Sequence, residues 1–420
     1  MVFVISFKGE WKMELLHCEE IAKQNNLLNI FVGANSTGKS YDLNKLFLDD
    51  YNAILLDEDG YCRANEGLQS YQVSVDNAYY ILQDSLQSEP IPIDTQYRDV
   101  IICCKKIKEK LNIKFLSLGA KKLLTIIDGI LSYNLAEVST FYFDEPENCL
   151  DDYNIKNINN IIESLLTCNK RIFIVTHSPR LLENLRPQIG NIFLKKKLFE
   201  GYLQITEEAI LQIQQKTMLE CYQYLSTPPK WVSIYIKKPA KFYKLYIDTF
   251  VHSQDFYRSL FYNEITLAEG LTEKYIVHSV HQLEMASNCF IFSNGKFNMP
   301  FLINFYQYLG KKIYCIFDSD VKSNQIHGAT QQINKYIESL IPSNQKIVFE
   351  PNLESELNVG IEVVKELFGN FTTAFSHKEL KELQHKFKPF IAVYGILSNK
   401  DRMNNLLQKL NTKAYEEWLI

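Results

Sequence analysis

The chain has 420 residues, of which 46% are hydrophobic and 22% are charged, and its formal net charge is −4 at pH 7. A chain of this length exceeds the usual size of a single domain, so we expect two or three domains with large hydrophobic cores. The small negative charge excludes a uniformly basic protein, which means that any surface for nucleic acid has to be local.

The composition also argues against membrane and disulfide chemistry. No stretch approaches the roughly 20 apolar residues of a membrane span, and the first ten residues lack the basic and apolar regions of a secretory leader. The nine cysteines include no C-x-x-C pair, which argues against a zinc ribbon and a disulfide framework. We therefore expect a cytoplasmic protein with reduced thiols and no membrane contact.

A phosphate-binding loop is the first motif along the chain. The apolar residues 30–32 predict a strand, a helical pattern begins near Lys39, and the eight residues 33–40 between them have the spacing G-x-x-x-x-G-K-[ST]. In such a loop the backbone N–H groups converge on phosphate oxygens, the lysine reaches the β- and γ-phosphates, and the final hydroxyl binds Mg²⁺. We predict ATP or GTP binding by Gly33, Asn35, Ser36, Thr37, Gly38, Lys39 and Ser40.

An acidic pair follows the next clear strand. The motif Leu116-Ser117-Leu118-Gly119-Ala120 precedes an amphipathic helical pattern. Further along the chain, the apolar residues 141–143 predict a buried strand that ends at Asp144 and Glu145. Ligands gather at the carboxyl ends of strands in open α/β sheets. We expect Asp144 to hold Mg²⁺ and Glu145 to orient or deprotonate the attacking water.

A histidine ends a third strand and completes a family pattern. The apolar residues 172–175 are followed by Thr176-His177-Ser178-Pro179. Taken with the phosphate loop and the acidic pair, these segments resemble the head of ABC-type ATPases. The resemblance implies that Ser117 and Gly119 belong to the signature motif and that His177 contacts the γ-phosphate.

The same resemblance implies an assembly. In that family the signature of one subunit closes over the nucleotide of another, so a chain with one set of motifs is expected to form at least a homodimer. A glutamine loop cannot be placed, because its candidates have no distinguishing surroundings; they are Gln69, Gln72, Gln83 and Gln87.

A basic and aromatic stretch separates the two halves of the chain. Residues 226–250 interleave lysines with aromatic residues and contain no acidic residue before Asp248. Lysines neutralise phosphates and aromatic rings stack on bases, so the stretch suits a nucleic-acid path, with Lys195–Lys197 as an extension. A solvated lysine face over an aromatic core seam is an equal alternative. The lysines are Lys230, Lys237, Lys238, Lys241 and Lys244.

The second half places carboxylates after two predicted strands, at 265–267 and 313–317. They are Glu269, with Glu273 four residues later, and Asp318 with Asp320. Side chains alternate along a strand, so Asp318 and Asp320 project to the same side. Glu269, Asp318 and Asp320 form a set of hard oxygen ligands suited to Mg²⁺ or Mn²⁺.

This half resembles a TOPRIM domain, the metal-binding module of topoisomerases, primases and several nucleases. An ABC-type head followed by TOPRIM is the order of OLD-family (overcoming lysogenization defect) nucleases, which cut DNA by a two-metal mechanism. The resemblance implies that Glu273 and Glu354 serve the second metal, with Glu356 as the rival of Glu354. It also implies a late lysine that stabilises the transition state, Lys388 with Lys386 as its rival, and a Gly-Lys turn at Asn294-Gly295-Lys296.

We therefore predict an α/β protein with an ABC-type ATPase domain at 1–200, a helical linker at 201–262, a TOPRIM domain at 263–370 and a helical segment at 371–420. The expected function is an ATP-binding, divalent-metal-dependent DNA endonuclease or nickase. Family analogy suggests an anti-phage effector, in a retron system with a reverse transcriptase and its RNA–DNA product as partners. The alternatives are a non-cutting ATP-dependent DNA repair clamp and a TOPRIM ribonuclease.

Overall fold

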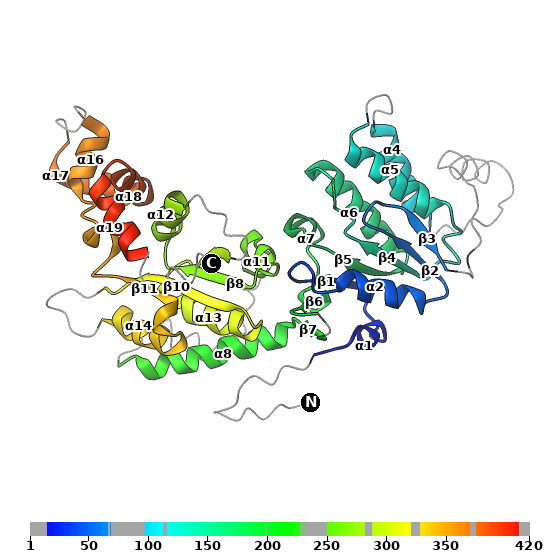
Figure 1. The fold of residues 1–420 in the computed structure, drawn as a ribbon, viewed down its shortest axis with the longest axis horizontal. Coiled ribbons are helices and arrows are strands. Elements are labelled where there is room, and N and C mark those ends of the chain that lie inside the picture. Colours follow the sequence, from blue (N-terminus) through cyan, green and yellow to red (C-terminus); the bar gives the residue numbers. More distant parts are fainter. Residues whose placement is uncertain are drawn as a thin grey trace. The chain divides into compact units, whose positions relative to one another are not determined.

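The computed structural model describes residues 15–65, 68, 97–111, 116–198, 200–226, 230, 250–281, 288–320, 328–369 and 375–410. The chain divides into two compact units (Figure 1). The first unit comprises Met1–Glu207 with Thr249–Phe261, and the second comprises Glu208–Asp248 with Tyr262–Ile420.

The first unit is built on a seven-stranded sheet in the order β3-β2-β4-β5-β1-β6-β7. The five central strands are parallel, and the edge strands β3 and β7 pair antiparallel with their neighbours. Central strands are apolar on both faces because helices cover both faces of such a sheet. The strands are β1 (Leu28–Val32), β2 (Ala53–Leu56), β3 (Cys62–Ala64), β4 (Thr140–Asp144), β5 (Arg171–Val175), β6 (Ile192–Lys195) and β7 (Tyr202–Gln204).

Helices lie on both faces of this sheet (Figure 1). Leu43, Leu46 and Phe47 of α2 pack with Phe31, Tyr142 and other strand residues on one face. On the other face, α5 contacts β2 and β3, and α6 contacts β5. The helices are α1 (Cys18–Ala22), α2 (Lys39–Leu48), α4 (Arg98–Lys110), α5 (Leu118–Leu131), α6 (Asp152–Thr167), α7 (Pro179–Leu185) and α11 (Gln254–Ser259).

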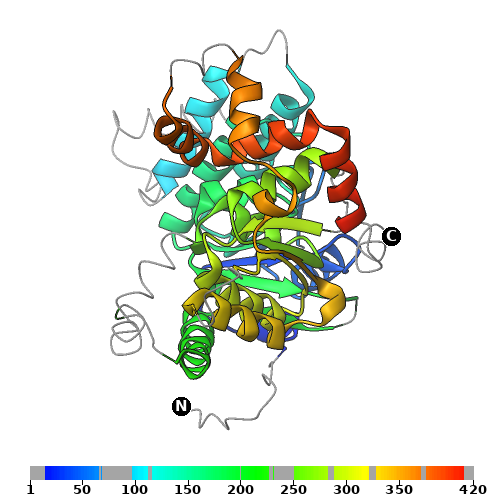
Figure 2. The same cartoon turned by 90° about the vertical axis from the view of Figure 1, so that its left-hand side faces the viewer.

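The second unit has a four-stranded parallel sheet in the order β11-β10-β8-β9. Figure 2 shows helices above and below this sheet. The strands are β8 (Glu264–Ala268), β9 (Asn288–Phe292), β10 (Lys312–Asp318) and β11 (Lys346–Phe349). The helices are α8 (Glu207–Tyr224), α12 (Leu271–His281), α13 (Met299–Tyr308), α14 (Ala329–Leu340), α15 (Leu353–Glu356), α16 (Ile361–Phe368), α17 (His377–Lys386), α18 (Lys388–Leu397) and α19 (Lys400–Leu410).

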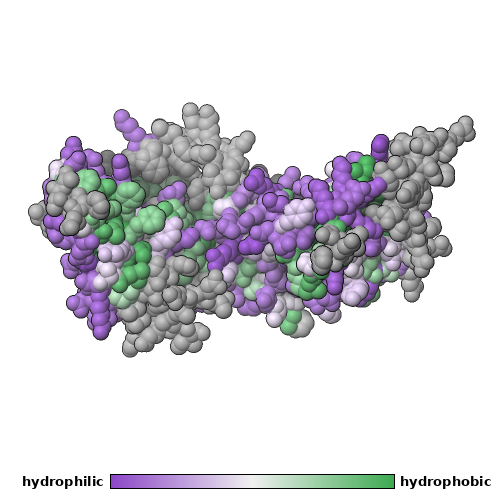
Figure 3. Space-filling view, turned by 90° about the horizontal axis from the view of Figure 1, so that it is seen from above, coloured by the Kyte–Doolittle hydropathy of each residue, from purple (hydrophilic) through white to green (hydrophobic). Residues whose placement is uncertain are grey.

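Alternation along β10 divides the second unit into two core layers. Tyr314 and Ile316 pack in one cluster with residues of β11, α12 and α16 to α19. Side chains alternate along a strand, so Ile313, Cys315 and Phe317 face the other side, where α13 contacts β8 and β10. The end of the unit formed by α17 and α18 exposes Phe387, Phe390 and Leu397, and Figure 3 shows hydrophobic residues among hydrophilic ones there.

The expected linker at 201–262 is not a separate unit in the structure. Its first residues continue the first sheet as β7, while α8 packs in the second unit through Thr217, which accepts a hydrogen bond from Asn304 Nδ2 at 2.8 Å. Residues 250–261 return to the first unit, where α11 contacts α7. Within the described residues, no helix is both long enough and apolar enough to span a membrane.

Candidate functional site

The phosphate loop connects the central strand β1 to the amino end of α2. Gly38, the residue before α2, has φ 80°, and Gly33 has φ 140°. A Cβ atom on Gly33 would lie 2.2 Å from the carbonyl oxygen of Lys195, so both the backbone angle and the close approach require glycine. The Lys39 ammonium donates to the carbonyl oxygens of Gly33 at 3.1 Å and Ala34 at 2.9 Å.

Burial perturbs the Lys39 side chain, which is 3% exposed. Desolvation lowers its pKa to about 8, partly offset by the charges of Glu145 and Asp144. The loop therefore holds an ammonium group that an anionic phosphate would stabilise. The remaining predicted loop residues, Asn35, Ser36 and Thr37, lie between Gly33 and Gly38, and the Thr37 hydroxyl donates to Ala34 O at 3.0 Å.

The two residues predicted to hold Mg²⁺ meet in the structure. The Ser40 hydroxyl donates to Asp144 Oδ1 at 2.8 Å, although 104 residues separate them. Asp144 is the last residue of β4, and burial raises the pKa of its carboxyl group. Hydroxyl and carboxylate oxygens are suitable ligands for Mg²⁺, so the pair fits that ion.

Glu145, predicted to act on the attacking water, and His177, expected to contact the γ-phosphate, are also in contact. His177 Nε2 lies 3.2 Å from Glu145 Oε1, and the Glu145 N–H donates to Val175 O at 2.9 Å. Burial, and then the charges of Glu147 and Asp144, raise the pKa of Glu145. Burial, and then the charge of Lys39, lower the pKa of His177 to about 4, which leaves the imidazole neutral at pH 7.

Two residues that the sequence did not single out position this pair. Glu147 Oε1 accepts from the Thr176 hydroxyl at 2.6 Å and from the His177 N–H at 3.0 Å. Lys122 on α5 donates to the carbonyl oxygens of Glu145 at 2.9 Å and Asn148 at 3.1 Å. The third acidic residue of Asp-Glu-Pro-Glu was the only available sequence signal for Glu147, and nothing local marked Lys122.

The predicted signature motif forms the start of α5. The Ser117 side chain caps the helix by accepting from the Ala120 N–H at 3.2 Å. A Cβ on Gly119 would lie 2.6 Å from Cys149 O, so α5 packs tightly against the turn that follows the acidic pair. The four candidates for a glutamine loop lie outside the described residues.

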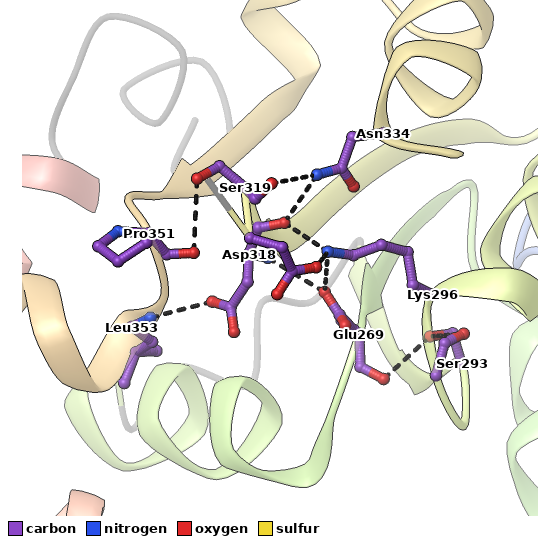
Figure 4. Close-up of polar contacts among 10 residues, drawn as sticks. Glu269, Ser293, Lys296, Asp318, Ser319, Asn334, Pro351 and Leu353 are labelled. Carbon is purple, nitrogen blue, oxygen red and sulfur yellow. Dashed lines mark hydrogen bonds and ion pairs between the residues drawn. The ribbon is translucent and has the colours of Figure 1, made fainter. Parts of the chain in front are cut away.

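The carboxylates of the second unit gather where β8 and β10 end (Figure 4). Glu269 follows β8, and its Oε2 accepts from the Asp318 N–H at 3.1 Å. Asp318 is the last residue of β10, and its Oδ1 accepts from the Leu353 N–H at 2.9 Å. Asp320 has φ 56°, and its N–H donates to Pro351 O at 2.8 Å. The parallel sheet therefore brings the three predicted ligands to one edge.

Lys296 lies among these carboxylates. Its ammonium donates to Asp318 O at 2.6 Å, lies 3.3 Å from Glu269 Oε2 and forms an ion pair with Asp320. The side chain is 2% exposed. The turn Asn294-Gly295-Lys296, expected from the resemblance, thus positions the Lys296 side chain among the carboxylates.

Glu273 is buried beside the same edge. It is 3% exposed, and its Oε2 has no hydrogen-bond partner among the residues that the structure describes. A Cβ on Gly270 would lie 2.7 Å from that oxygen, so glycine leaves the space that Glu273 occupies. Burial raises the pKa of Glu273, as it does that of Glu269. Burial, and then the charge of Glu273, raise the pKa of Asp318 to about 8.

Glu354 and Lys388, the two later residues expected from the family resemblance, also lie near these carboxylates. Lys388 Nζ lies 2.9 Å from Glu354 Oε1. Burial alone would lower the pKa of Lys388, but its hydrogen bond with Glu354 and the charges of Glu354, Glu273 and Asp318 raise it. The rival Glu356 instead accepts from the Glu350 N–H at 2.6 Å, and Lys386 is exposed at the end of α17.

Asn334, which the sequence did not single out, supports the aspartate loop. Its Nδ2 donates to Asp318 O at 3.1 Å and to Ser319 O at 2.7 Å. Within the described part of the chain, no three His, Cys, Asp or Glu side chains lie close enough together to hold a metal ion as they stand. A bound ion would therefore have to draw the carboxylates closer.

The basic stretch can be followed only in part. Residues 231–249, with most of its lysines, lie outside the described residues, whereas Lys230 is exposed. Lys195, expected to extend the stretch, is instead 3% exposed and forms an ion pair with Asp42. Because Lys195 is buried beside the phosphate loop and paired with Asp42, a nucleic acid cannot reach it. We therefore remove Lys195 from the candidate nucleic-acid surface.

Residues 260–320 match the family described as "Overcoming lysogenization defect protein-like, TOPRIM domain". The expected OLD-like TOPRIM domain is therefore confirmed for this segment, which contains the carboxylates after β8 and β10 together with Lys296. The expected mixed α/β fold with parallel sheets is confirmed too.

Two solved structures show a weak likeness to the chain. One is an inward-facing metal-chelate type ABC transporter, with 18% identity and a TM-score of 0.27 over 44% of this chain and 78% of that chain. The other is cbiO1 from Clostridium perfringens, part of the ABC transporter complex cbiONQ, with 18% identity and a TM-score of 0.26 over 46% and 81%. At these scores neither likeness bears on function. No curated protein matches the sequence.

Proposed function

We propose that the chain is an ATP-binding, divalent-metal-dependent DNA endonuclease. The observation that carries this proposal is the gathering of Glu269, Glu273 and Asp318 at one edge of a parallel sheet, inside the segment that matches a TOPRIM family. Catalytic groups of open α/β sheets lie at this edge.

The residues present fit a divalent cation. Their donors are hard carboxylate oxygens, the kind that Mg²⁺ and Mn²⁺ prefer. Within the described parts of the chain, Glu273 Oε2 is buried without a hydrogen-bond partner. The raised pKa of Asp318 reflects burial beside like charges that a cation would relieve. Glu269, Glu273, Asp318 and Glu354 would hold the ion, which when bound activates water and stabilises the leaving oxygen.

Lys388 supports catalysis next to these ligands. Its ammonium group is paired with Glu354 and its side chain is 44% exposed, so a phosphate can approach it from solvent. A lysine at this place stabilises negative charge that develops on the phosphodiester. The Leu353 N–H holds the Asp318 carboxylate in place, and the Asn334 side chain holds the Asp318 carbonyl oxygen.

The first unit is the proposed ATP site. Lys39 and the loop backbone bind phosphates, Ser40 and Asp144 hold Mg²⁺, and Glu145 with His177 acts on the attacking water. Ser117 and Gly119 would close over the nucleotide of a second copy, which makes the active form a homodimer. ATP would then gate DNA cleavage, while an anti-phage role and a reverse-transcriptase partner stay predictions from family resemblance.

The test is cleavage of plasmid, single-stranded DNA and RNA with Mg²⁺ or Mn²⁺. Asp318→Asn should reduce DNA cleavage by more than about 100-fold, because it removes a ligand charge with little change in shape. Glu264→Gln is the matched control, since Glu264 starts β8 at the opposite end from Glu269. Cleavage by Asp318→Asn at the control rate would remove the proposed site, and cleavage of RNA alone would favour the ribonuclease.

A further inference from the structure

An exposed aromatic face lies on α18. Phe390 and Tyr394 are four residues apart, so they project from the same side of the helix, and Phe387 precedes its first turn. Phe390 is 69% exposed, and the other two rings are exposed as well. A different side of α18 packs in the core, where Ile391 and Ile396 are buried. The three aromatic rings are therefore not needed for the core of the second unit.

Tyr275 of α12 extends this face. Helix α12 contacts α18, and Ile276 is buried in the same cluster as Ile391. The rings of Tyr275 and Phe390 are stacked, with their centroids 6.5 Å apart and their planes at 23°. Tyr275 is 44% exposed. Two helices that are fixed by a shared core thus present a pair of nearly parallel rings to solvent.

This aromatic pair is adjacent to the proposed catalytic groups on both helices. Glu273 precedes Tyr275 by two residues, and Lys388 precedes Phe390 by two residues. The charges of Glu273 and Lys388 act on each other, and Lys388 Nζ lies 2.9 Å from Glu354 Oε1. Two residues advance a helix by only about 3 Å. A strand whose phosphate reaches Lys388 can therefore place a neighbouring nucleotide at the two rings.

The residues around the rings are basic. The sequence has no acidic residue between Glu382 and Asp401, whereas His385, Lys386 and Lys388 fall within this span and are exposed. Proteins that bind single strands combine positive charge, which follows the phosphates, with aromatic rings on which bases stack. The alternation of basic and aromatic side chains favours a nucleic-acid strand over an apolar protein surface as the occupant of this face.

We propose that Tyr275 and Phe390 form a stacking platform for an unpaired base of the DNA strand whose phosphate lies at Lys388. The inference rests on the proposed nuclease function and deepens it by naming the substrate class, which is DNA with unpaired bases beside the cleaved bond. In an intact duplex each base is already paired and stacked, so exposing its face costs free energy. The platform selects single strands, flaps and gaps without reading sequence, because every base has a π face.

The first experiment measures binding apart from cleavage. A fluorescein-labelled oligothymidylate of about 12 nucleotides, within the usual site size for single strands, is titrated with protein in Ca²⁺ in place of Mg²⁺, and anisotropy gives the Kd. Phe390→Ala and Tyr275→Ala should each raise the Kd about tenfold, because each removes a stacking surface. Phe390→Trp and Tyr275→Phe keep a ring and should bind like the wild type. Tyr222→Ala is the matched control, because Tyr222 of α8 is also 44% exposed.

Binding by both alanine variants that is as tight as that of Tyr222→Ala would overturn the platform. An all-abasic strand of the same length, which keeps the phosphates and removes every base, tests the stacking itself. Wild type and Phe390→Ala should bind this strand equally, because the ring has no base to contact. A Kd that Phe390→Ala still raises about tenfold on the abasic strand would show that the ring does not act by stacking, and would also overturn the inference.

Other strands separate this inference from the proposed function. Phe390→Ala should change the Kd for a blunt DNA duplex by less than about twofold, and a tenfold change there would overturn the selection of unpaired bases. Ring-dependent binding that is tighter for oligouridylate would keep the platform and overturn the assignment of DNA. Ring-dependent binding by a wild-type protein that cuts no strand would overturn the nuclease function alone. If sedimentation shows that Phe390→Ala turns a dimer into a monomer, the aromatic face joins two copies of the chain and the platform is overturned.

Discussion

Lys39 and Asp318 show how burial prepares both sites at the residue scale. Desolvation lowers the pKa of the Lys39 ammonium to about 8 and raises that of the Asp318 carboxyl group to about 8. In each case burial disfavours the charged form, and a ligand of opposite charge restores it. The nucleotide phosphates would do this for Lys39, and a divalent cation would do it for Asp318.

The pKa of His177 leads to a pH prediction. It is about 4 in the folded unit and 6.5 in an exposed histidine, so between these values the unfolded chain binds a proton that the folded unit does not. The stability contribution of His177 is therefore complete above pH 6.5 and is lost as the pH falls toward 4. His177→Gln should flatten the dependence of melting temperature on pH in this window. Equal slopes for both proteins in calorimetry would show that His177 titrates normally.

Glu145 allows a test of ATP chemistry. Glu145→Gln keeps the shape of the side chain and removes its basicity, so the variant should bind ATP but hydrolyse it about 100-fold more slowly or worse. Fluorescent-nucleotide binding and phosphate release measure the two steps separately. Lys39→Ala is the contrasting variant, since it should lose nucleotide binding itself. Normal turnover by Glu145→Gln would remove that residue from the role of base.

At the scale of elements, α5 is joined to the turn that begins at Glu145, the residue proposed to act on the attacking water. Gly119 allows the helix to approach Cys149 O, and Lys122 binds the carbonyl oxygens of Glu145 and Asn148. Any movement of α5 would therefore change the position of Glu145. We therefore expect α5, which bears the predicted signature motif, and Glu145 to move together.

Lys122 tests this coupling. Lys122→Met should lower the turnover of ATP about tenfold or more, because Glu145 loses a charge-assisted main-chain anchor, while nucleotide affinity should stay near the wild-type value. Lys121→Met is the control, since Lys121 is adjacent on α5 and exposed. Restored turnover in Lys122→Arg would support a positioning role. A parallel loss of affinity and turnover would instead indicate general damage to the unit.

At the scale of the whole molecule, the two proposed sites belong to different hydrophobic cores. The phosphate loop lies in the first unit and the TOPRIM carboxylates lie in the second. Each core can therefore unfold at its own temperature, and a ligand that binds only one folded unit stabilises that unit. The sites can be separated by calorimetry without measuring cleavage.

We expect two calorimetric transitions, one raised by ATP with Mg²⁺ and the other by Mn²⁺ alone. A ligand at 100 times its Kd stabilises a folded unit by about 2.7 kcal/mol. Lys39→Ala should abolish the first shift only, and Glu273→Gln should reduce the second only. A single transition shifted by both ligands would mean that the two units unfold cooperatively.

Part of this organisation could be predicted because it depends on local spacing. The glycine and lysine spacing of residues 33–40 identifies a phosphate loop, and carboxylates after apolar strands identify the carboxyl edge of a sheet. Parallel strands bring such ends together, which is why Glu269 and Asp318 meet as expected. Glu354 and Lys388 were placed by family resemblance, and the structure brings them together at 2.9 Å.

The sequence alone determined the phosphate loop, the strand-end carboxylates and the mixed α/β fold, since each depends on neighbouring residues. Only the tertiary structure decided which charges neutralise one another. It pairs Lys296 with Asp320, Lys195 with Asp42 and Lys122 with the turn after Glu145. These contacts join residues 24, 153 and 23 positions apart. Such pairs form only when strands and helices pack, because a buried ammonium takes whichever oxygen atoms the fold brings within reach.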